Sequence, residues 1–289
     1  MKEALYYEKT STYVVCELCP HKCEIAQGKS GLCRTRINID GKLIAAGYGS
    51  VSALGLDPIE KKPLRHFYPG SWILSLGGFG CNMQCAFCQN HAISQNRVFI
   101  NSCEPASKDF FASEEVLRKA YSQHKNIGIA FTYNEPLINI EYIMDIAPLF
   151  RAYGLKIVLV TNGLICPEPL ADLLPLIDAL NIDVKGFNEA FYKKLGGDLS
   201  TVKNTVETAA TRCHVEITNL IVPGENDIPE EMEALADWLA TISPEIPLHI
   251  NRFFPHYRMT NKPPTLLDTL NKLAAIAQSK LRHVHIGNI

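Results

Sequence analysis

The chain has 289 residues, 47% of them hydrophobic, so it can bury a large core as one big domain or two smaller ones. Its 28 Lys and Arg side chains nearly balance 30 Asp and Glu, which leaves no sustained field to attract nucleic acid or an anionic membrane. No apolar run approaches the roughly 20 residues of a membrane span, and the first residues lack the apolar core of a secretory signal. We therefore expect a cytoplasmic protein that binds neither nucleic acid nor a membrane.

Ten cysteines are present, and seven of them fall into two tight clusters. Such clustering in a chain of this size is unusual for a secreted disulfide scaffold, and in a reducing compartment it indicates metal binding. Thiolates and incompletely ligated clusters oxidise readily, which favours an anaerobic or well-reduced setting. The other three, Cys103, Cys166 and Cys213, are expected to be packing residues.

The first cluster comprises Cys16, Cys19, Cys23 and Cys33 at C-x2-C-x3-C-x9-C spacing. Four cysteines this close can complete a tetrahedral site. One interpretation is a zinc ion or a cluster that staples a segment too short to fold alone. The other is an auxiliary iron–sulfur cluster that feeds electrons to a second cluster. His21 lies inside the loop and could replace one cysteine as a ligand.

The segment after this cluster alternates around Asp40-Gly41, which predicts a hairpin because Asp-Gly readily adopts the positive φ that the turn needs. Three prolines and mixed charges then indicate an ordered connector. We expect three units, namely a cysteine-rich metal-binding N-terminal segment with the hairpin (1–56), the connector (57–71) and a core domain (72–289).

From Trp72 onward, apolar strands alternate with amphipathic helices. Strands are expected near 72–78, 127–133, 155–163, 179–187, 214–222, 247–253 and 283–287, and helices near 113–124, 138–152, 168–178, 188–210, 229–241 and 265–279. Six or seven βα units predict a parallel sheet with right-handed crossovers. Because the count falls short of eight, we predict an α/β fold with an open, partial (β/α)6-type TIM barrel, and a doubly wound sheet is the alternative. In either fold, ligands bind at the carboxyl ends of the strands.

The second cluster, Cys81, Cys85 and Cys88, follows the first expected core strand at C-x3-C-x2-C spacing. Three thiolates in one small loop can hold one metal cluster. A closed iron–sulfur or zinc site needs four ligands, so this loop leaves one coordination position for a group that is not protein. Half of a zinc site completed from elsewhere is the alternative.

Polar side chains follow the next strands. Asn134 and Glu135 come after the second strand, where an amide and a carboxylate can hydrogen-bond an ammonium group. Asp183 and Lys185 alternate with Val184 along the fourth strand, so both can face the barrel. They are expected either to form a buried ion pair or to bind a ribose and a carboxylate.

Several segments together resemble the radical S-adenosylmethionine (radical SAM) superfamily in its activating-enzyme-like branch, and more narrowly the radical SAM enzymes of the AmmeMemoRadiSam system. They are the N-terminal four-cysteine segment, DPIEKKPLRHFYPG, GCNMQCAFCQN, FTYNEP, VTNG, NIDVKGF, LIVPGEND, RFFPHYRM and the final HIGN.

The resemblance implies a [4Fe-4S] cluster on Cys81, Cys85 and Cys88 whose open iron binds SAM. Reductive cleavage of SAM would give methionine and a 5′-deoxyadenosyl radical that abstracts hydrogen from an unassigned substrate. An electron donor such as flavodoxin or ferredoxin is expected, and the substrate is a small molecule or a partner protein. The expected SAM-binding residues are Phe87, Asn134, Glu135, Thr161, Asn162, Asp183, Lys185, Leu220 and Tyr257.

The chain departs from the family pattern at a few positions. The usual Gly-Gly-Glu after the second strand is here Asn134-Glu135. The pyruvate formate-lyase activating enzymes, which the chain also resembles, have an acidic residue at the position of Val160 and an arginine at that of Thr218. The resemblance to these enzymes makes installation of a glycyl radical on a partner protein an alternative function, and the two departures count against it. A non-catalytic iron–sulfur electron carrier is an alternative of another class.

Overall fold

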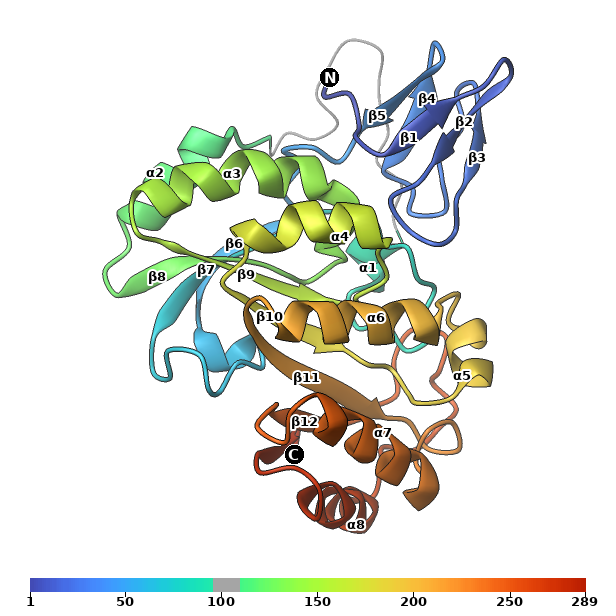
Figure 1. Cartoon of the computed structure of the whole chain (residues 1–289), viewed down its shortest axis with the longest axis vertical. Helices are drawn as coiled ribbons and strands as arrows, with labels where there is room; N and C mark the ends of the chain where they lie inside the picture. Colours follow the sequence, from blue (N-terminus) through green and yellow to red (C-terminus); the bar gives the residue numbers. More distant parts are fainter. Residues whose placement is uncertain (96–109) are drawn as a thin grey trace.

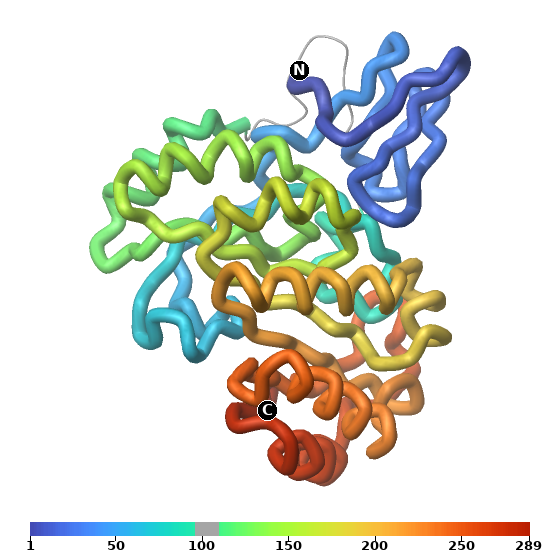
Figure 2. The backbone as a smooth tube through the Cα atoms, viewed as in Figure 1, coloured from blue at the N-terminus to red at the C-terminus, as the bar shows by residue number. Residues whose placement is uncertain are grey.

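The computed structural model describes residues 1–95 and 110–289. Cys103 lies outside these ranges. Figure 2 shows the chain passing from the N-terminal strands at the top to the last helix at the bottom, so the termini lie toward opposite ends of the molecule. Within the described ranges, no helix is long and apolar enough to cross a membrane.

An eight-stranded sheet organises the core (Figure 1). Its order is β13-β12-β11-β10-β9-β8-β7-β6, with β7 to β13 parallel and β6 antiparallel to β7. The strands are β6 (Ala53–Pro58), β7 (Trp72–Gly77), β8 (Asn126–Phe131), β9 (Lys156–Thr161), β10 (Ala179–Asp183), β11 (His214–Ile221), β12 (Leu248–Arg252) and β13 (Val284–Gly287). The parallel strands follow one another in chain order without a reversal, as in a barrel, and β6 and β13 are the two edges. The predicted open, partial barrel is confirmed.

Helices connect the parallel strands on the outside of the sheet. Figure 1 shows α3, α4, α6 and α7 succeeding one another along the same face. The single helix expected over 188–210 is two helices, because Asp198 caps α6 by accepting a hydrogen bond from the Thr201 amide at 2.7 Å. The helices are α1 (His91–Ser94), α2 (Ser113–Tyr121), α3 (Ile140–Ala152), α4 (Pro167–Leu173), α5 (Glu189–Lys194), α6 (Leu199–Ala210), α7 (Pro229–Ile242) and α8 (Leu267–Gln278), with short 3-10 helices η1 (Ile59–Lys61), η2 (Pro136–Asn139) and η3 (Leu174–Leu176).

The N-terminal segment forms two small antiparallel sheets. One contains β1 (Tyr7–Lys9), β2 (Tyr13–Cys16) and β3 (Glu24–Ala26), and the other is the hairpin of β4 (Arg36–Ile39) and β5 (Lys42–Ala45). The predicted hairpin is confirmed, and both turn residues have positive φ, 51° at Asp40 and 72° at Gly41. Strand β6 was not expected, and it runs across the predicted boundary between residues 56 and 57.

Contacts tie this N-terminal segment to the barrel. The Arg36 guanidinium forms a buried ion pair with Glu141 of α3, and the Leu5 amide donates to the same carboxylate at 2.8 Å. The Cys166 amide donates to the Leu18 carbonyl at 3.0 Å. The first 45 residues are therefore packed against the core and held there by hydrogen bonds.

The connector after β6 closes the amino-terminal end of the barrel. Its apolar side chains Ile59, Leu64 and Phe67 form one buried cluster with Ile73, Ala130, Val158 and Ala179 of four core strands. Behind this cluster, the buried Glu216 accepts hydrogen bonds from the backbone amides of Arg65 at 3.0 Å and His66 at 2.8 Å. Ring nitrogens of His214 and His249 lie 2.9 and 2.6 Å from its oxygens. Burial opposes ionisation, but these hydrogen bonds outweigh it and lower the pKa of Glu216 to about 2.

Replacing Glu216 by Gln is expected to lower the free energy of unfolding by about 2 to 3 kcal/mol at pH 7. Since the folded-state pKa of about 2 lies below the usual 4.5, the stability that the carboxylate contributes is present above pH 4.5 and is lost as the pH falls toward 2. Thermal denaturation of both proteins from pH 7 to pH 3 should show the difference in Tm shrinking below pH 5. A difference that is constant over this range would contradict the assignment.

Candidate active site

A cavity of about 330 Å³ opens at the carboxyl ends of the parallel strands. Its lining includes every predicted catalytic and SAM-binding residue except Tyr257, namely Cys81, Cys85, Phe87, Cys88, Asn134, Glu135, Thr161, Asn162, Asp183, Lys185 and Leu220. Residues up to 139 positions apart in the sequence thus meet at one edge of the sheet, as strand-end ligand sites require.

The cysteine loop supplies three thiols to this cavity. Cys81 and Cys85 are half-buried. Burial raises the pKa of Cys85 to about 11 and that of Cys81 well above its usual value. Metal ligation by these groups must therefore release protons. The described lining residues include no fourth cysteine and no histidine. Within 1–95 and 110–289, no three His, Cys, Asp or Glu side chains are arranged around one metal ion. A four-iron cluster binds each thiolate through a different iron, so three thiols spread around one cavity fit a cluster better than a single ion.

Asn134 holds the loop that leads to the cysteines. Its side-chain oxygen accepts from the Gly78 amide at 2.8 Å, and its amide nitrogen lies 3.1 Å from the carbonyl oxygens of both Phe79 and Gly80. The predicted hydrogen bond from this side chain to an ammonium group would therefore compete with its hydrogen bonds to the loop. The geometry makes Asn134 a brace for the cysteine loop.

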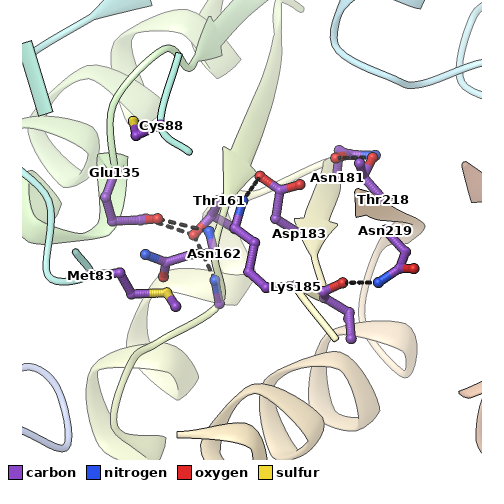
Figure 3. A network of polar contacts seen from close by, with 12 residues as sticks. Met83, Cys88, Glu135, Thr161, Asn162, Asn181, Asp183, Lys185, Thr218 and Asn219 are labelled. Atoms are coloured by element: carbon purple, nitrogen blue, oxygen red, sulfur yellow. Dashed lines mark hydrogen bonds and ion pairs between the residues drawn. The ribbon is translucent and has the colours of Figure 1, made fainter. Parts of the chain in front are cut away.

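Glu135 is buried beside the end of β9 (Figure 3). Its carboxylate accepts from the Thr161 hydroxyl at 2.6 Å and from the backbone amides of Asn162 at 2.7 Å and Leu137 at 3.0 Å. Burial raises the pKa of Glu135 to about 7, although these hydrogen bonds oppose the shift. The predicted residues Glu135, Thr161 and Asn162 thus form one connected unit at the cavity wall.

Asn162 links that unit to the cysteine loop. Its side-chain nitrogen lies 2.9 Å from the Asn82 side-chain oxygen and 3.7 Å from the Cys81 sulfur. The Asn82 side chain in turn donates to the Leu164 carbonyl at 2.8 Å. The loop after β9 therefore fixes the position of the first cysteine of the cluster.

Asp183 and Lys185 both face the cavity from the end of β10 and form an ion pair at 2.8 Å, as Figure 3 shows. Burial disfavours the charged form of Lys185, but the Asp183 carboxylate and the Cys85 thiolate outweigh it and raise the pKa of the ammonium. The expected ion pair is therefore present. Both of its charged groups line the cavity, so a ligand bound there can contact each of them.

Two aromatic predictions have different outcomes. The buried Phe87 lines the cavity between the second and third cysteines. Tyr257 does not line it: this residue has φ 54°, and its ring stacks on His91 of α1 with centroids 4.3 Å apart. The next residue also contacts the cysteine loop, because the Arg258 amide donates to the Ala86 carbonyl at 2.9 Å. Sequence patterns did not indicate these contacts.

Sequence reasoning missed other lining residues. Lys61, Lys62 and Tyr133 face the cavity beside β6 and β8, and Asn251 and Asn288 face it from β12 and the end of the chain. The two asparagines follow the strand-end rule that located Asp183, so that rule could have found them. The lysines come from the connector, which carried no such signal.

The four N-terminal cysteines line a second, small cavity of about 10 Å³ next to the cysteine loop. His21 lies with them, and its ring nitrogen is 2.7 Å from the Asn82 carbonyl oxygen. A Cβ at Gly80 would overlap the Cys33 carbonyl oxygen, so the two cysteine segments are in direct contact. Metal binding by Cys16, Cys19, Cys23 and Cys33 stays a prediction.

Solved structures share this fold. A radical SAM methyltransferase from Sphaerobacter thermophilus superposes with a TM-score of 0.56 at 15% identity, over 76% of this chain and 67% of that one. SuiB of Streptococcus suis, bound to S-adenosylmethionine, superposes with a TM-score of 0.53 at 14% identity, over 72% of this chain and 47% of that one.

Sequence relatives and a family model extend the similarity. The uncharacterized protein MJ0808 of Methanocaldococcus jannaschii is 40% identical over 303 residues, which cover all of this chain and 86% of that protein. The (2S)-3-sulfopropanediol dehydratase activating enzyme of Klebsiella oxytoca is 22% identical over 130 residues, 44% of this chain and 41% of that enzyme. The Radical SAM superfamily model matches residues 76–239, more than half of the chain. The chain therefore belongs to the radical SAM superfamily.

Proposed function

We propose that this protein is a radical SAM enzyme that cleaves SAM reductively and abstracts hydrogen from a substrate. Membership of the superfamily implies a [4Fe-4S] cluster and SAM. The observation that carries the proposal is the set of three loop thiols around one cavity, with no fourth cysteine or histidine among the described residues of its lining. Such a donor set suits a cluster with one iron left for SAM.

The residues of the cavity have distinct proposed roles. Cys81, Cys85 and Cys88 would hold the cluster, which supplies the electron that cleaves SAM to methionine and a 5′-deoxyadenosyl radical. The Lys185 ammonium would bind the SAM carboxylate while Asp183 meets the ribose hydroxyls. The buried Phe87 would cover the cofactors and exclude water. Glu135, Thr161 and Asn162 would keep the wall beside Cys81 in place.

Anaerobic reconstitution with iron and sulfide tests this function. After chemical reduction, or reduction by flavodoxin or ferredoxin, the protein is expected to convert SAM to 5′-deoxyadenosine and methionine, both measurable by chromatography. An electron carrier without SAM chemistry would take up iron and be reduced, yet it would form no 5′-deoxyadenosine. That result would overturn the enzymatic proposal.

A glycyl-radical activating enzyme is the second candidate, favoured by the similarity to the activating enzyme of Klebsiella oxytoca. Val160 and Thr218 line the cavity, where neither can bind SAM as a charged residue would. The Thr218 hydroxyl donates to the Asn181 side chain at 2.9 Å. A glycyl radical detected by electron paramagnetic resonance on a partner protein, after incubation with SAM and reductant, would support this candidate.

Replacing Cys81, Cys85 and Cys88 together by Ala is expected to leave metal bound at the N-terminal cysteines, because Cys16, Cys19, Cys23 and Cys33 line a separate cavity. Elemental analysis of the reconstituted variant measures the residual metal. Zinc would identify a structural staple, and iron with sulfide would identify an auxiliary cluster. A variant that retains neither metal would contradict the predicted second site.

A further inference from the structure

A buried lysine forms part of the cavity floor. Lys62 follows η1 in the connector, between Ile59 and Leu64, whose side chains pack into the barrel. The next residue is also fixed, because the Asn181 side chain donates to the Pro63 carbonyl at 2.9 Å. The Lys62 side chain is only 3% exposed, and it lines the same cavity as the three loop cysteines.

The charges around Lys62 do not cancel. Its ammonium lies 2.9 Å from a carboxylate oxygen of Asp57, and the Lys61 ammonium lies 3.4 Å from the other oxygen. The Tyr133 hydroxyl also donates to Asp57 at 2.8 Å, and the Lys62 ammonium lies 4.7 Å from the centre of the Tyr133 ring. Two ammonium groups thus share one carboxylate. The Lys61 side chain is 66% exposed to solvent, so the buried charge on this side of the cavity is that of Lys62.

The ammonium of Lys62 also has unused hydrogen-bonding capacity. An ammonium carries three donors, and within the described parts of the chain Asp57 is the hydrogen-bond partner of Lys62. Burial lowers the pKa of Lys62, although the hydrogen bond and the charge of Asp57 oppose this shift. A buried cation of this kind gains most from an anion that enters the cavity.

The other charged groups of the cavity are already engaged. Asp183 and Lys185 pair with each other, and Glu135 accepts three hydrogen bonds at the wall beside Cys81. SAM brings one carboxylate, which the proposed function assigns to Lys185. The positive charge of Lys61 and Lys62 is left for another ligand.

We propose that Lys62, assisted by Lys61, binds an anionic group of the substrate, either a carboxylate or a phosphate. This inference rests on the proposed function, because it treats the cavity as the place where substrate meets SAM. Asp57 and Tyr133 position the Lys62 ammonium. Lys62 is buried because the neighbouring connector residues Ile59 and Leu64 pack into the barrel. The substrate class is thereby narrowed to molecules or peptide segments with an anionic group.

Binding of inorganic phosphate and of acetate to the reconstituted, SAM-loaded protein tests the inference by isothermal titration calorimetry. Lys62→Met should weaken binding of the better probe at least about tenfold, since a charge-assisted hydrogen bond is lost. Lys193→Met, at an exposed position on α5, is the matched control and should leave binding unchanged. Asp57→Asn should strengthen binding, because it removes the competing charge and keeps an oxygen for Lys62 and Tyr133.

The outcomes separate this inference from the proposed function. Three outcomes would overturn the inference even if SAM is cleaved. They are no binding of either anion, equal binding by the Lys62→Met variant and the original protein, and displacement of the probe as the SAM concentration is raised. Absence of SAM cleavage would overturn the proposed function, and the anion titration can still be read. If Lys62→Met does not fold, anion binding by Asp57→Asn tests the inference. Unchanged or weaker binding by this variant would mean that the Asp57–Lys62 ion pair is only structural and would overturn the inference.

Discussion

Replacing Cys85 by Ala is expected to reduce formation of 5′-deoxyadenosine from SAM to the background of the reaction without protein. Cys85 lines the cavity between the other two loop cysteines, and two thiolates cannot hold a cluster in the site-differentiated form that binds SAM. The measurement is 5′-deoxyadenosine formed by the anaerobically reconstituted and reduced variant, together with its iron content. Loss of a ligand should lower both.

Cys213→Ala provides the matched control. This thiol donates to the Ala209 carbonyl at 3.6 Å and does not line the cavity. The variant should keep cleavage within about twofold, because removing a partly buried sulfur costs only a modest amount of stability. Retention of cleavage by Cys85→Ala would refute the cluster assignment. Equal losses in both variants would show that the effect comes from folding.

Short-range patterns predicted much of the site. The spacing of Cys81, Cys85 and Cys88 defines a single loop whatever the rest of the fold is, and the strand-end rule placed Glu135 and Lys185 at the same edge of the sheet. These inferences require only that each strand is recognised from its own residues and that the carboxyl ends of parallel strands lie at the same edge of the sheet. The structure brings all five residues to one cavity.

The missed features depend on long-range pairing. Strand β6 is an antiparallel edge, so its register is set by β7 and by no periodicity of its own. In the sequence, Lys62 is one of several charged residues in a polar connector. It is buried because the neighbouring apolar residues pack into the barrel. Asn134 lines the cavity as expected, and its contact with a ligand stays a prediction. Folding also brings Gly78 and Gly80 within reach of its amide, and these contacts could not be read from the sequence.

One buried ion pair, between Arg36 and Glu141, joins the N-terminal segment to the core. Arg36→Met is therefore the substitution with the largest expected effect on the free energy of unfolding. The side chains of Arg36 and Glu141 are 1% and 0% exposed, and the Arg36 guanidinium also donates to the Leu5 carbonyl at 2.9 Å. Removing the guanidinium leaves a buried carboxylate without its counter-charge. The free energy of unfolding, measured by chemical denaturation, should fall by about 3 to 5 kcal/mol.

The double variant Arg36→Met/Glu141→Leu should recover a large part of that loss, because it removes both charges and keeps apolar volume between β4 and α3. Arg118→Met, at an exposed position on α2, should change the free energy of unfolding by less than about 0.5 kcal/mol. A loss below about 1 kcal/mol in Arg36→Met would mean that the pair is solvated in solution. Since Cys33 contacts the loop before Cys81, loosening this segment should also slow reconstitution of the cluster, and the rate of iron uptake measures that coupling.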